Sequence, residues 1–460
     1  MTSRAPDTPP LMISVAGVRG IVGASLTPPV LTRFAAAFAR ELGEGPIVVG
    51  RDARISGPMV LRAVAAGVTA AGRDLVDIGL ATTPATQLAV EHLHAAGGII
   101  LTASHNPAPW NALKFLSARG EFLGPEEGQA VRERFEADRD LWVAFDRLGA
   151  IREESHALDW HLERVLSLRH IDLAKIRARK LEVVVDGCAS VGGVAVPRLL
   201  RELGAEAIEL DCEPNGQFTR VLEPLPENLG ALGARVRAAR ADFGVAVDPD
   251  ADRAAFVDAD GKPLGEEYTV ALGTRVALAT EKGPVVTNLS TSRILDAVCD
   301  TFGVPLHRTP VGEAHVVGRM RALGAVAGGE GNGGMILPAA HFGRDGLVAV
   351  ALIAQAMAVS GRSLRELAGE LPMYYMVKSK LDRSTEPWER TAARIRASFG
   401  SFHLDSADGL RFDQGDEWVH VRASGTEPVV RVIAESPTLE RTNELVEVAR
   451  NAVRAPRQEV

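Results

Sequence analysis

The stretch LEVVVDGCASVGGVAVPRLLRELGAEAIEL, residues Leu181–Leu210, decides the fold class. A β-branched run is followed by a glycine-rich turn, then by a segment with helical apolar spacing, and then by a second apolar run. This order is typical of a strand–loop–helix–strand unit in an α/β protein with buried strands. The alternation recurs where PIVVG precedes RDARISG, GGII precedes LTASHNP, FGVAV precedes DPDADR and PVVT precedes NLSTSR. Because ligands bind beyond the carboxyl ends of such strands, we expect these polar loops to carry the chemistry.

Four domains are expected from the order of these units. The 460 residues leave room for three or four domains of ordinary size. Three α/β units follow one another, and after Pro372 the segment MYYMVKSKLD begins a smaller C-terminal domain. The expected ranges are 1–150, 151–256, 257–370 and 371–460.

The composition is that of a globular protein, with 46% hydrophobic and 24% charged residues. A net charge of -8 argues against a nucleic-acid partner but allows a local basic pocket for a small anion. The N-terminus MTSRAPDTPPLMIS lacks the apolar core of a signal peptide. The run Leu347–Val359 is too short to cross a bilayer and is expected to be a buried core helix. Three scattered cysteines suit a reducing compartment, so we predict a cytoplasmic protein without a membrane partner.

The first polar loop, TASHNP, places Ser104 directly after an apolar run. No G-x-S-x-G elbow surrounds this serine, which argues against an α/β-hydrolase nucleophile. Pro107 keeps Asn106 out of the helical region and so fixes the exit of the loop. Taken alone, the loop is more typical of a plain turn, in which His105 is a structural hydrogen-bonding residue.

The second loop, DPDADR, contains the alternating carboxylates Asp248, Asp250 and Asp252. Such a set suits a hard divalent cation, which prefers oxygen ligands. An EF-hand is excluded, because Arg253 stands where its sixth position needs glycine and Ala259 where its twelfth needs glutamate. A solvated acidic turn is the remaining alternative, although carboxylates this close repel unless a metal or arginines neutralise them. The pattern favours a metal, and Mg²⁺ if the substrate carries phosphate.

The third loop, GGEGNGG at 328–334, contains a formal G-x-G-x-x-G. A dinucleotide site is not expected, because Pro338 interrupts the helix that should follow and Glu330 would repel a pyrophosphate. A carboxylate and an amide in a glycine-rich loop suit the recognition of hydroxyl groups, here through Glu330 and Asn332. A flexible turn is the equal alternative for this loop alone.

The fourth loop, RASGTEPVVR, runs from Arg422 to Arg431. Two guanidinium groups, two hydroxyls and free backbone N–H groups match the oxygens of a phosphate. No Walker pattern is present, so a nucleoside triphosphate is not implied. The alternative of a charged surface turn is weakened by so many donors of this kind.

Together these loops resemble the α-D-phosphohexomutase family, which includes phosphoglucomutase, phosphomannomutase and phosphoglucosamine mutase. TASHNP is similar to its phosphoserine loop, DPDADR to its metal loop, GEGNGG to its sugar loop and RASGTEP to its phosphate loop, in the same order. The fragments GVRG, GRDARISG and TPVGEAHV agree, so the resemblance covers nearly the whole chain. It implies a heart-shaped architecture of three related α/β domains and a smaller C-terminal α+β domain around a central active-site cleft.

The resemblance also implies a role for each loop. The transferred phosphoryl group would be carried by Ser104 and surrounded by His105, Lys114 and Arg19. The metal, Mg²⁺, would be held by Asp248, Asp250, Asp252 and an oxygen of phosphorylated Ser104. The substrate would be bound by Arg253, Glu330, Asn332, Arg422, Ser424, Gly425, Thr426 and Arg431.

The implied reaction interconverts a hexose 1-phosphate and a hexose 6-phosphate. Phosphorylated Ser104 would give its phosphoryl group to the 6-hydroxyl of a sugar 1-phosphate. The resulting sugar 1,6-bisphosphate would turn end for end and return its other phosphoryl group to Ser104. The implied cofactors are Mg²⁺, phosphorylated Ser104 and the sugar 1,6-bisphosphate as activator and intermediate. The implied partner is a small-molecule sugar phosphate, and the protein is expected to be a monomer or homodimer. Lys114 is expected to move a proton, because lysine, unlike arginine, can lose its own.

The sugar loop departs from the pattern of many relatives, which have a histidine where this chain has Gly334. His341, in HFGRDG, is a candidate to replace it in part. The GEGNGG loop resembles the phosphoglucosamine mutase branch and some archaeal-type phosphohexomutases, which favours glucosamine phosphate as substrate. A phosphomannomutase/phosphoglucomutase is the alternative within the family. Alternatives of another class are a non-catalytic sugar-phosphate binding protein and a metal-dependent phosphatase that uses Ser104.

Overall fold

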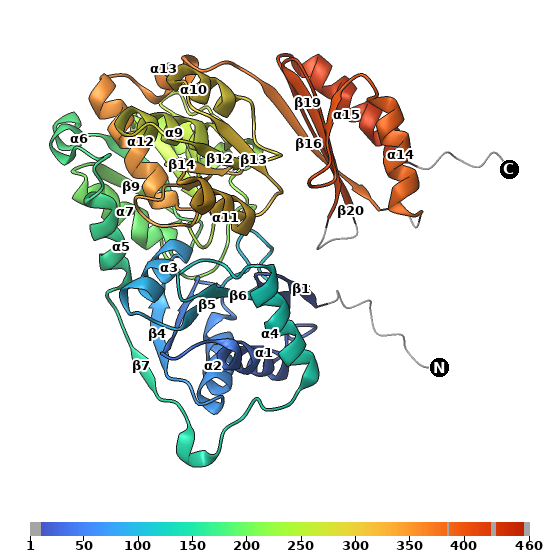
Figure 1. The fold of residues 1–460 in the computed structure, drawn as a ribbon. Helices are drawn as coiled ribbons and strands as arrows, with labels where there is room; N and C mark the ends of the chain where they lie inside the picture. The colour runs from blue at the N-terminus through green and yellow to red at the C-terminus, as the bar shows by residue number, and fades with distance from the viewer. Residues whose placement is uncertain (1–10, 384–385, 425–428, 455–460) are drawn as a thin grey trace, which may run out of the picture.

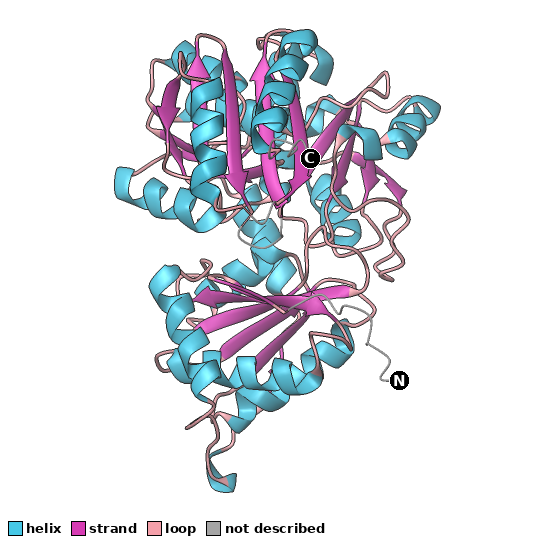
Figure 2. Cartoon of the chain, turned by 90° about the vertical axis from the view of Figure 1, so that its right-hand side faces the viewer, coloured by secondary structure: helices cyan, strands magenta, loops and turns pink. Residues whose placement is uncertain are grey.

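The described part of the chain folds into four sheets, each covered by helices. We describe it from a computed structural model that places residues 11–383, 386–424 and 429–454. The N-terminal sheet lies at the bottom of Figure 1, the next two units at upper left and the C-terminal sheet at upper right. Figure 2, from the side, also shows the first sheet below the other three units. The predicted four-domain α/β architecture is confirmed.

The N-terminal unit contains a seven-stranded sheet in the order β1-β2-β6-β5-β3-β4-β7. Its elements are β1 (Met12–Ser14), β2 (Gly17–Ile21), α1 (Pro28–Glu41), β3 (Ile47–Arg51), α2 (Gly57–Ala70), β4 (Leu75–Leu80), α3 (Thr83–His92), β5 (Gly97–Leu101), β6 (Trp110–Ser117), α4 (Pro125–Ala137), the 3-10 helix η1 (Phe145–Arg147) and β7 (Ile151–Glu153). Successive side chains of β3 alternate between faces, so Ile47 and Val49 pack towards α1 and α2 and Val48 towards α3. β7, which pairs with β4, lies just beyond the expected boundary at residue 150.

The second unit has a four-stranded sheet in the order β11-β10-β8-β9. Its elements are α5 (Ala157–Leu166), α6 (Leu173–Arg179), β8 (Glu182–Asp186), α7 (Gly192–Glu202), β9 (Glu206–Leu210), the 3-10 helix η2 (Pro226–Asn228), α8 (Gly230–Ala239), β10 (Phe243–Val247) and β11 (Ala254–Asp258). β8, α7 and β9 occupy the stretch that predicted a strand–loop–helix–strand unit, and the two strands pair in parallel. That prediction is confirmed.

The third unit has a sheet in the order β13-β12-β14-β15. Its elements are α9 (Glu267–Thr280), β12 (Val285–Asn288), α10 (Ile294–Phe302), β13 (Leu306–Thr309), α11 (Glu313–Leu323), β14 (Ala327–Glu330), β15 (Gly334–Ile336), α12 (Gly346–Ser360) and α13 (Leu364–Gly369). α12 is the predicted buried core helix, and its apolar residues join those of α7 and α9 in one core shared by the second and third units. No helix in the described part of the chain has the length and apolar composition needed to span a bilayer.

The C-terminal unit is an antiparallel sheet in the order β16-β20-β19-β18-β17, with two helices. Its elements are β16 (Tyr375–Asp382), α14 (Trp388–Ser398), β17 (His403–Asp405), β18 (Leu410–Gln414), β19 (Glu417–Ala423), β20 (Val429–Ser436) and α15 (Leu439–Val453). It is the expected smaller α+β domain. Residues of all four units line one cavity, which lies where parallel strands of the first three units end.

Candidate active site

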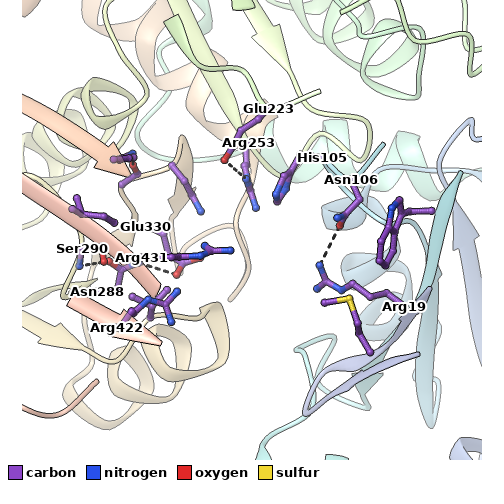
Figure 3. A pocket seen from close by; sticks show the side chains of 17 residues that line it. Arg19, His105, Asn106, Glu223, Arg253, Asn288, Ser290, Glu330, Arg422 and Arg431 are labelled. Carbon is purple, nitrogen blue, oxygen red and sulfur yellow. Dashed lines mark hydrogen bonds and ion pairs between the residues drawn. The ribbon is translucent and has the colours of Figure 1, made fainter. Parts of the chain in front are cut away.

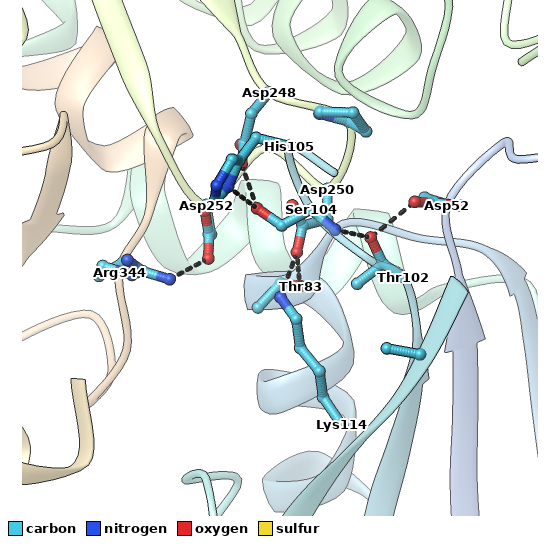
Figure 4. A network of polar contacts seen from close by, with 12 residues as sticks. Asp52, Thr83, Thr102, Ser104, His105, Lys114, Asp248, Asp250, Asp252 and Arg344 are labelled. Carbon is cyan, nitrogen blue, oxygen red and sulfur yellow. Dashed lines mark hydrogen bonds and ion pairs between the residues drawn. The ribbon is translucent and has the colours of Figure 1, made fainter. Parts of the chain in front are cut away.

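Ser104 lies in the loop that follows the fully buried strand β5. Its backbone has a φ of 49°, in the left-handed region that few residues other than glycine adopt. The Ser104 Oγ donates a hydrogen bond of 2.8 Å to Asp248 Oδ2 and lies 3.5 Å from His105 Nδ1. Figure 4 shows the serine held between the acidic loop and this imidazole. The hydroxyl therefore points at the carboxylates that the sequence predicted as a metal site.

Arg54 stabilises this unusual backbone conformation by clamping the carbonyl groups of the loop. Its buried guanidinium donates hydrogen bonds of 2.6 Å to the carbonyl oxygens of Ser104 and Asn106, and further bonds to those of Pro107 and Trp110. Charged donors make stronger hydrogen bonds than neutral ones, so this clamp offsets the strain at Ser104.

Asp52 connects Arg54 to the backbone N–H of Ser104 through Thr102. One of its carboxylate oxygens accepts hydrogen bonds from Arg54 Nε and from the Thr102 hydroxyl. The Thr102 hydroxyl in turn accepts from the Ser104 N–H at 2.9 Å. The serine is therefore fixed through both its N–H and its carbonyl group.

The acidic loop brings three carboxylates together, as the sequence predicted. Asp248, Asp250 and Asp252 are each 0% exposed, and one oxygen from each lies within 4.8 Å of the others. The Thr83 hydroxyl and Lys114 Nζ each lie 2.8 Å from Asp250 Oδ2. Asp250 Oδ1 and Asp252 Oδ1 are buried and accept no hydrogen bond within the described ranges.

The charges of this triad call for a cation. Burial, together with repulsion from Asp252 and Asp250, raises the pKa of Asp248 well above its usual range. Burial acts to raise the pKa of Asp250, but the Lys114 ammonium, the Thr83 hydrogen bond and the charge of Arg253 together outweigh it, and the net pKa lies below the usual range. Oxygen ligands without partners, in a buried cluster of negative charge, are the surroundings that a hard divalent cation prefers. The triad could hold such a metal ion.

A cavity of about 420 Å³ opens beside Ser104 and is lined by residues of all four units. Arg19 and His105 lie on one side of it, and Arg422 and Arg431 on the other (Figure 3). Arg19 Nη1 donates to Asn106 Oδ1 at 3.2 Å. Burial, with the charges of Arg253 and Arg19, lowers the pKa of His105 well below its usual range, so the imidazole is neutral. The cavity thus has the Arg19 guanidinium and a neutral imidazole at one end and the guanidinium groups of Arg422 and Arg431 at the other.

The two cations face each other directly. Arg422 on β19 and Arg431 on β20 are partners in the strand register. Like charges in this position repel, and burial and the charge of Arg431 lower the pKa of Arg422. An anion between the two guanidinium groups would relieve that repulsion, which supports the predicted phosphate site.

The sugar-loop residues line the middle of the same cavity. Glu330 Oε1 accepts hydrogen bonds from Asn288 Nδ2 at 2.8 Å and from the Gly312 N–H at 3.0 Å. Asn332 Oδ1 is buried without a hydrogen-bond partner in the described parts of the chain. A buried amide oxygen without a partner destabilises the protein until a donor reaches it, and a sugar hydroxyl is such a donor.

Comparison with known proteins decides the family. The chain matches all four models of the phosphoglucomutase/phosphomannomutase family: α/β/α domain I at residues 12–141, domain II at 159–261, domain III at 265–375 and the C-terminal domain at 376–452. The chain belongs to this family. It is therefore an enzyme of the phosphohexomutase class, as the resemblance implied.

Individual relatives agree over nearly the full length. A phosphoglucomutase/phosphomannomutase of Thermococcus kodakarensis is 37% identical, with 94% of this chain and 96% of the relative covered. A probable phosphoglucosamine mutase of Methanopyrus kandleri is also 37% identical, with 96% and 98% covered. The crystal structure of a putative phosphomannomutase from Thermus thermophilus superposes with a TM-score of 0.83 at 27% identity, covering 97% of this chain and 99% of that one.

Most of the predicted site residues meet in or beside the cavity of the mutase. Arg19, His105, Arg253, Glu330, Asn332, Arg422 and Arg431 line it, and Ser104, Lys114 and the acidic triad lie next to it. Ser424 is buried, and its N–H donates to the Val429 carbonyl. Gly425 and Thr426 lie outside the described residues.

The expectation for His341 is wrong. This histidine is 3% exposed, and its Nε2 lies 3.1 Å from Asp345 Oδ2 beside the buried His161. It packs in the core shared by the second and third units and does not line the cavity among the described residues.

Sequence reasoning missed other residues of the site, namely Asp52, Arg54, Thr83, Asn288 and Arg344. Four of them had a usable signal in the sequence. Asp52, Arg54 and Asn288 stand in polar loops that follow predicted strands, and Arg344 stands shortly before the predicted helix at Leu347–Val359. Their contacts with Ser104, Asp250 and Glu330 could not be read from spacing, because the partners lie in other units or loops.

Proposed function

We propose that the enzyme interconverts glucosamine 6-phosphate and glucosamine 1-phosphate through a phosphorylated Ser104. The observation that carries this proposal is the Ser104 hydroxyl, which donates to a buried aspartate triad beside a cavity with a facing arginine pair. The hydroxyl could carry a phosphoryl group, the triad a Mg²⁺ ion and the arginines the second phosphate. Each component has a distinct place around one cavity.

Mg²⁺ is the metal that we propose for the triad, because carboxylate oxygens and a phosphate oxygen are its preferred ligands. Asp248, Asp250 and Asp252 would hold it together with an oxygen of phosphorylated Ser104. When bound, the ion would neutralise charge on the transferring phosphoryl group. Arg19 and the neutral His105, on the cavity side, would contribute hydrogen bonds to the same group.

The reaction proceeds in two balanced transfers in this proposal. The free hydroxyl oxygen of the sugar monophosphate forms a bond to phosphorus as the bond between Ser104 Oγ and phosphorus breaks. The bisphosphate so formed, a glucosamine 1,6-bisphosphate, turns end for end within the cavity. Its other phosphoryl group then returns to Ser104 as the sugar oxygen regains a proton. Arg422 and Arg431 must therefore accept either phosphate, which suits a clamp that binds phosphate and not the ring.

We assign the proton of the sugar hydroxyl to Lys114, which would accept it as a neutral amine and return it to the sugar oxygen from the ammonium form that pairs with Asp250. We expect Lys114→Arg to lower the turnover number by about 100-fold, because arginine keeps its proton at all relevant pH values. The charge opposite Asp250 remains, so the dissociation constant for glucosamine 6-phosphate should change by less than about threefold. Steady-state kinetics and calorimetric binding to the unphosphorylated enzyme measure the two quantities. Near-normal turnover would remove the acid/base role.

The choice of sugar rests on the relatives and on the GEGNGG loop. The Methanopyrus kandleri relative is a probable phosphoglucosamine mutase. The GEGNGG loop also resembles the sugar loop of the phosphoglucosamine mutase branch. The second candidate is a phosphomannomutase/phosphoglucomutase, favoured by the Thermococcus kodakarensis relative of equal identity. We propose a cytoplasmic location, supported by three free and buried cysteines.

One panel of substrates tests the choice. The 1-phosphates of glucosamine, glucose, mannose and N-acetylglucosamine are compared with Mg²⁺ and an activating bisphosphate. We expect the highest kcat/KM for glucosamine 1-phosphate, by about tenfold or more. A clear preference for the mannose or glucose compound would favour the second candidate. Steady release of inorganic phosphate without an isomerised sugar phosphate would instead indicate a phosphatase.

A further inference from the structure

Arg344 joins the metal loop to the sugar loop through one buried guanidinium. Its Nη2 donates to Asp252 Oδ2 at 2.6 Å, and its Nη1 donates to Glu330 Oε2 at 2.9 Å. Its Nε donates to Glu313 Oε2 at 2.9 Å, so the group satisfies three carboxylates at once. Arg344 is 7% exposed. The planar, rigid fork of a guanidinium group suits this task, because its donors point in fixed directions.

Gly334 provides the space for this arginine. A Cβ atom at Gly334 would lie 2.3 Å from Arg344 Cδ, closer than any real contact between such atoms. The φ of Gly334 is not in the left-handed region, so the backbone itself would accept alanine. The absence of a side chain at residue 334 is therefore matched to the stem of Arg344.

Arg344 does not touch the space where substrate would lie. It is not among the described residues that line the cavity, whereas Glu330 is. Asp252 Oδ2 is held by Arg344, whereas Asp252 Oδ1 has no hydrogen-bond partner among the described residues and lies 3.6 Å from Arg253 Nε. Arg344 thus donates to Asp252 at the metal site and to Glu330 at the sugar site without lining the cavity itself. Figure 4 shows the contact with Asp252.

We propose that Arg344 is a positioning residue that sets both the metal affinity and the sugar affinity of the enzyme while contacting neither ligand. This inference rests on the proposed function of the two loops. A hydrogen bond to the outer oxygen of a metal ligand fixes the direction of its inner oxygen, and such partners change metal affinity by about 10–100-fold. The same fork fixes the Glu330 carboxylate, so that Glu330 meets sugar hydroxyls without first being ordered.

Arg344→Lys tests the proposal, because lysine keeps the positive charge but has a single point of donors. The variant should fold, since the buried carboxylates keep a cation. We expect its affinity for Mn²⁺, measured by electron paramagnetic resonance without sugar, to fall by about tenfold. We expect its affinity for glucosamine 6-phosphate, measured by calorimetry in chelator on the unphosphorylated protein, to fall by at least about fivefold. Inorganic phosphate, held by Arg422 and Arg431, should bind within about twofold of the original affinity.

Gly334→Ala is a second variant that changes no charge and displaces the Arg344 stem. Its Cβ would also lie 3.0 Å from Asn332 Oδ1, so only its Mn²⁺ affinity is informative, and this should fall in the same direction. Gly318→Ala is the matched control, because Gly318 is exposed on α11 and a Cβ there meets nothing within 4 Å. That control should bind Mn²⁺ as the unmodified protein does.

Each outcome decides. Loss of both Mn²⁺ and sugar-phosphate affinity with phosphate affinity retained supports the proposal. Retention of either affinity in Arg344→Lys overturns it, and so does a parallel loss of phosphate affinity, because the whole site would then be disordered. If the unmodified protein binds neither Mn²⁺ nor the sugar phosphate, the proposed function itself fails. If the unmodified protein binds both ligands and Arg344→Lys binds them equally well, only the role of Arg344 fails.

Discussion

Ser104→Ala is expected to abolish mutase activity, with turnover lower by about 10⁴-fold or more, because the variant lacks the hydroxyl proposed as covalent carrier. The Oγ of Ser104 makes hydrogen bonds within a strained, clamped loop, and no second serine donates to the acidic triad among the described residues. The variant should also stay unphosphorylated after incubation with glucosamine 1,6-bisphosphate. Steady-state turnover and the intact mass of the protein, followed by peptide mapping, measure both effects.

A matched serine substitution separates this effect from general damage. Ser167→Ala removes an exposed hydroxyl that only donates to the Arg164 carbonyl one turn earlier. It should leave both turnover and the phosphorylated mass unchanged. Substantial mutase activity in Ser104→Ala, or a phosphoryl group mapped to another residue, would contradict the proposed carrier.

Asp248→Asn is expected to inactivate the enzyme and to stabilise the metal-free protein. Metal-dependent turnover should fall by about 10³-fold, because one charged ligand of the proposed Mg²⁺ is lost. At the same time the melting temperature in chelator should rise, by about 2 °C, because repulsion among three buried carboxylates decreases. Burial and repulsion from Asp252 and Asp250 raise the pKa of Asp248, which means that its charged form destabilises the metal-free protein. The substitution should therefore lower turnover but raise the melting temperature. Thermal unfolding with and without Mg²⁺ measures the change.

The added stabilisation by Mg²⁺ should also disappear in this variant, because a ligand stabilises a protein only as far as it binds the folded state. Asp260→Asn serves as its control, since Asp260 lies in the exposed turn after β11 and its carboxylate pairs with Arg365 at the surface. It should keep both turnover and the stabilisation by Mg²⁺. A melting temperature that falls in metal-free Asp248→Asn would mean that the triad does not destabilise the fold.

The local pattern of the sequence predicted a strand–loop–helix–strand unit and a buried core helix correctly, and it located the polar loops that follow strands. The stretch Leu181–Leu210 forms β8, α7 and β9, and Leu347–Val359 lies within the buried helix α12. These predictions succeeded because strand and helix periodicities are properties of neighbouring residues. The loops that carry Ser104, Asp248 and Glu330 could be found for the same reason, since each follows or ends an apolar strand.

Contacts between distant parts of the chain decided the rest of the site. Thr83 reaches Asp250 across 167 residues, and Arg344 reaches Asp252 across 92. His341 has the right residue type and a suitable place in the sequence, but packing turns it towards Asp345 and into the core. Direction and burial of a side chain depend on how whole units pack, which no local spacing records.

By itself, the sequence determined the α/β class, the order of the four domains and the chemical character of each loop, because these follow from local periodicity and residue type. Only the tertiary structure decided which groups support them: the Arg54 clamp behind Ser104, the Thr83 contact and the Arg344 bridge that fills the space beside Gly334. The physical reason is that a buried charge is stable only where its partners surround it. Those partners come from separate loops, and for Thr83 and Arg344 from separate units, which meet only in the folded chain.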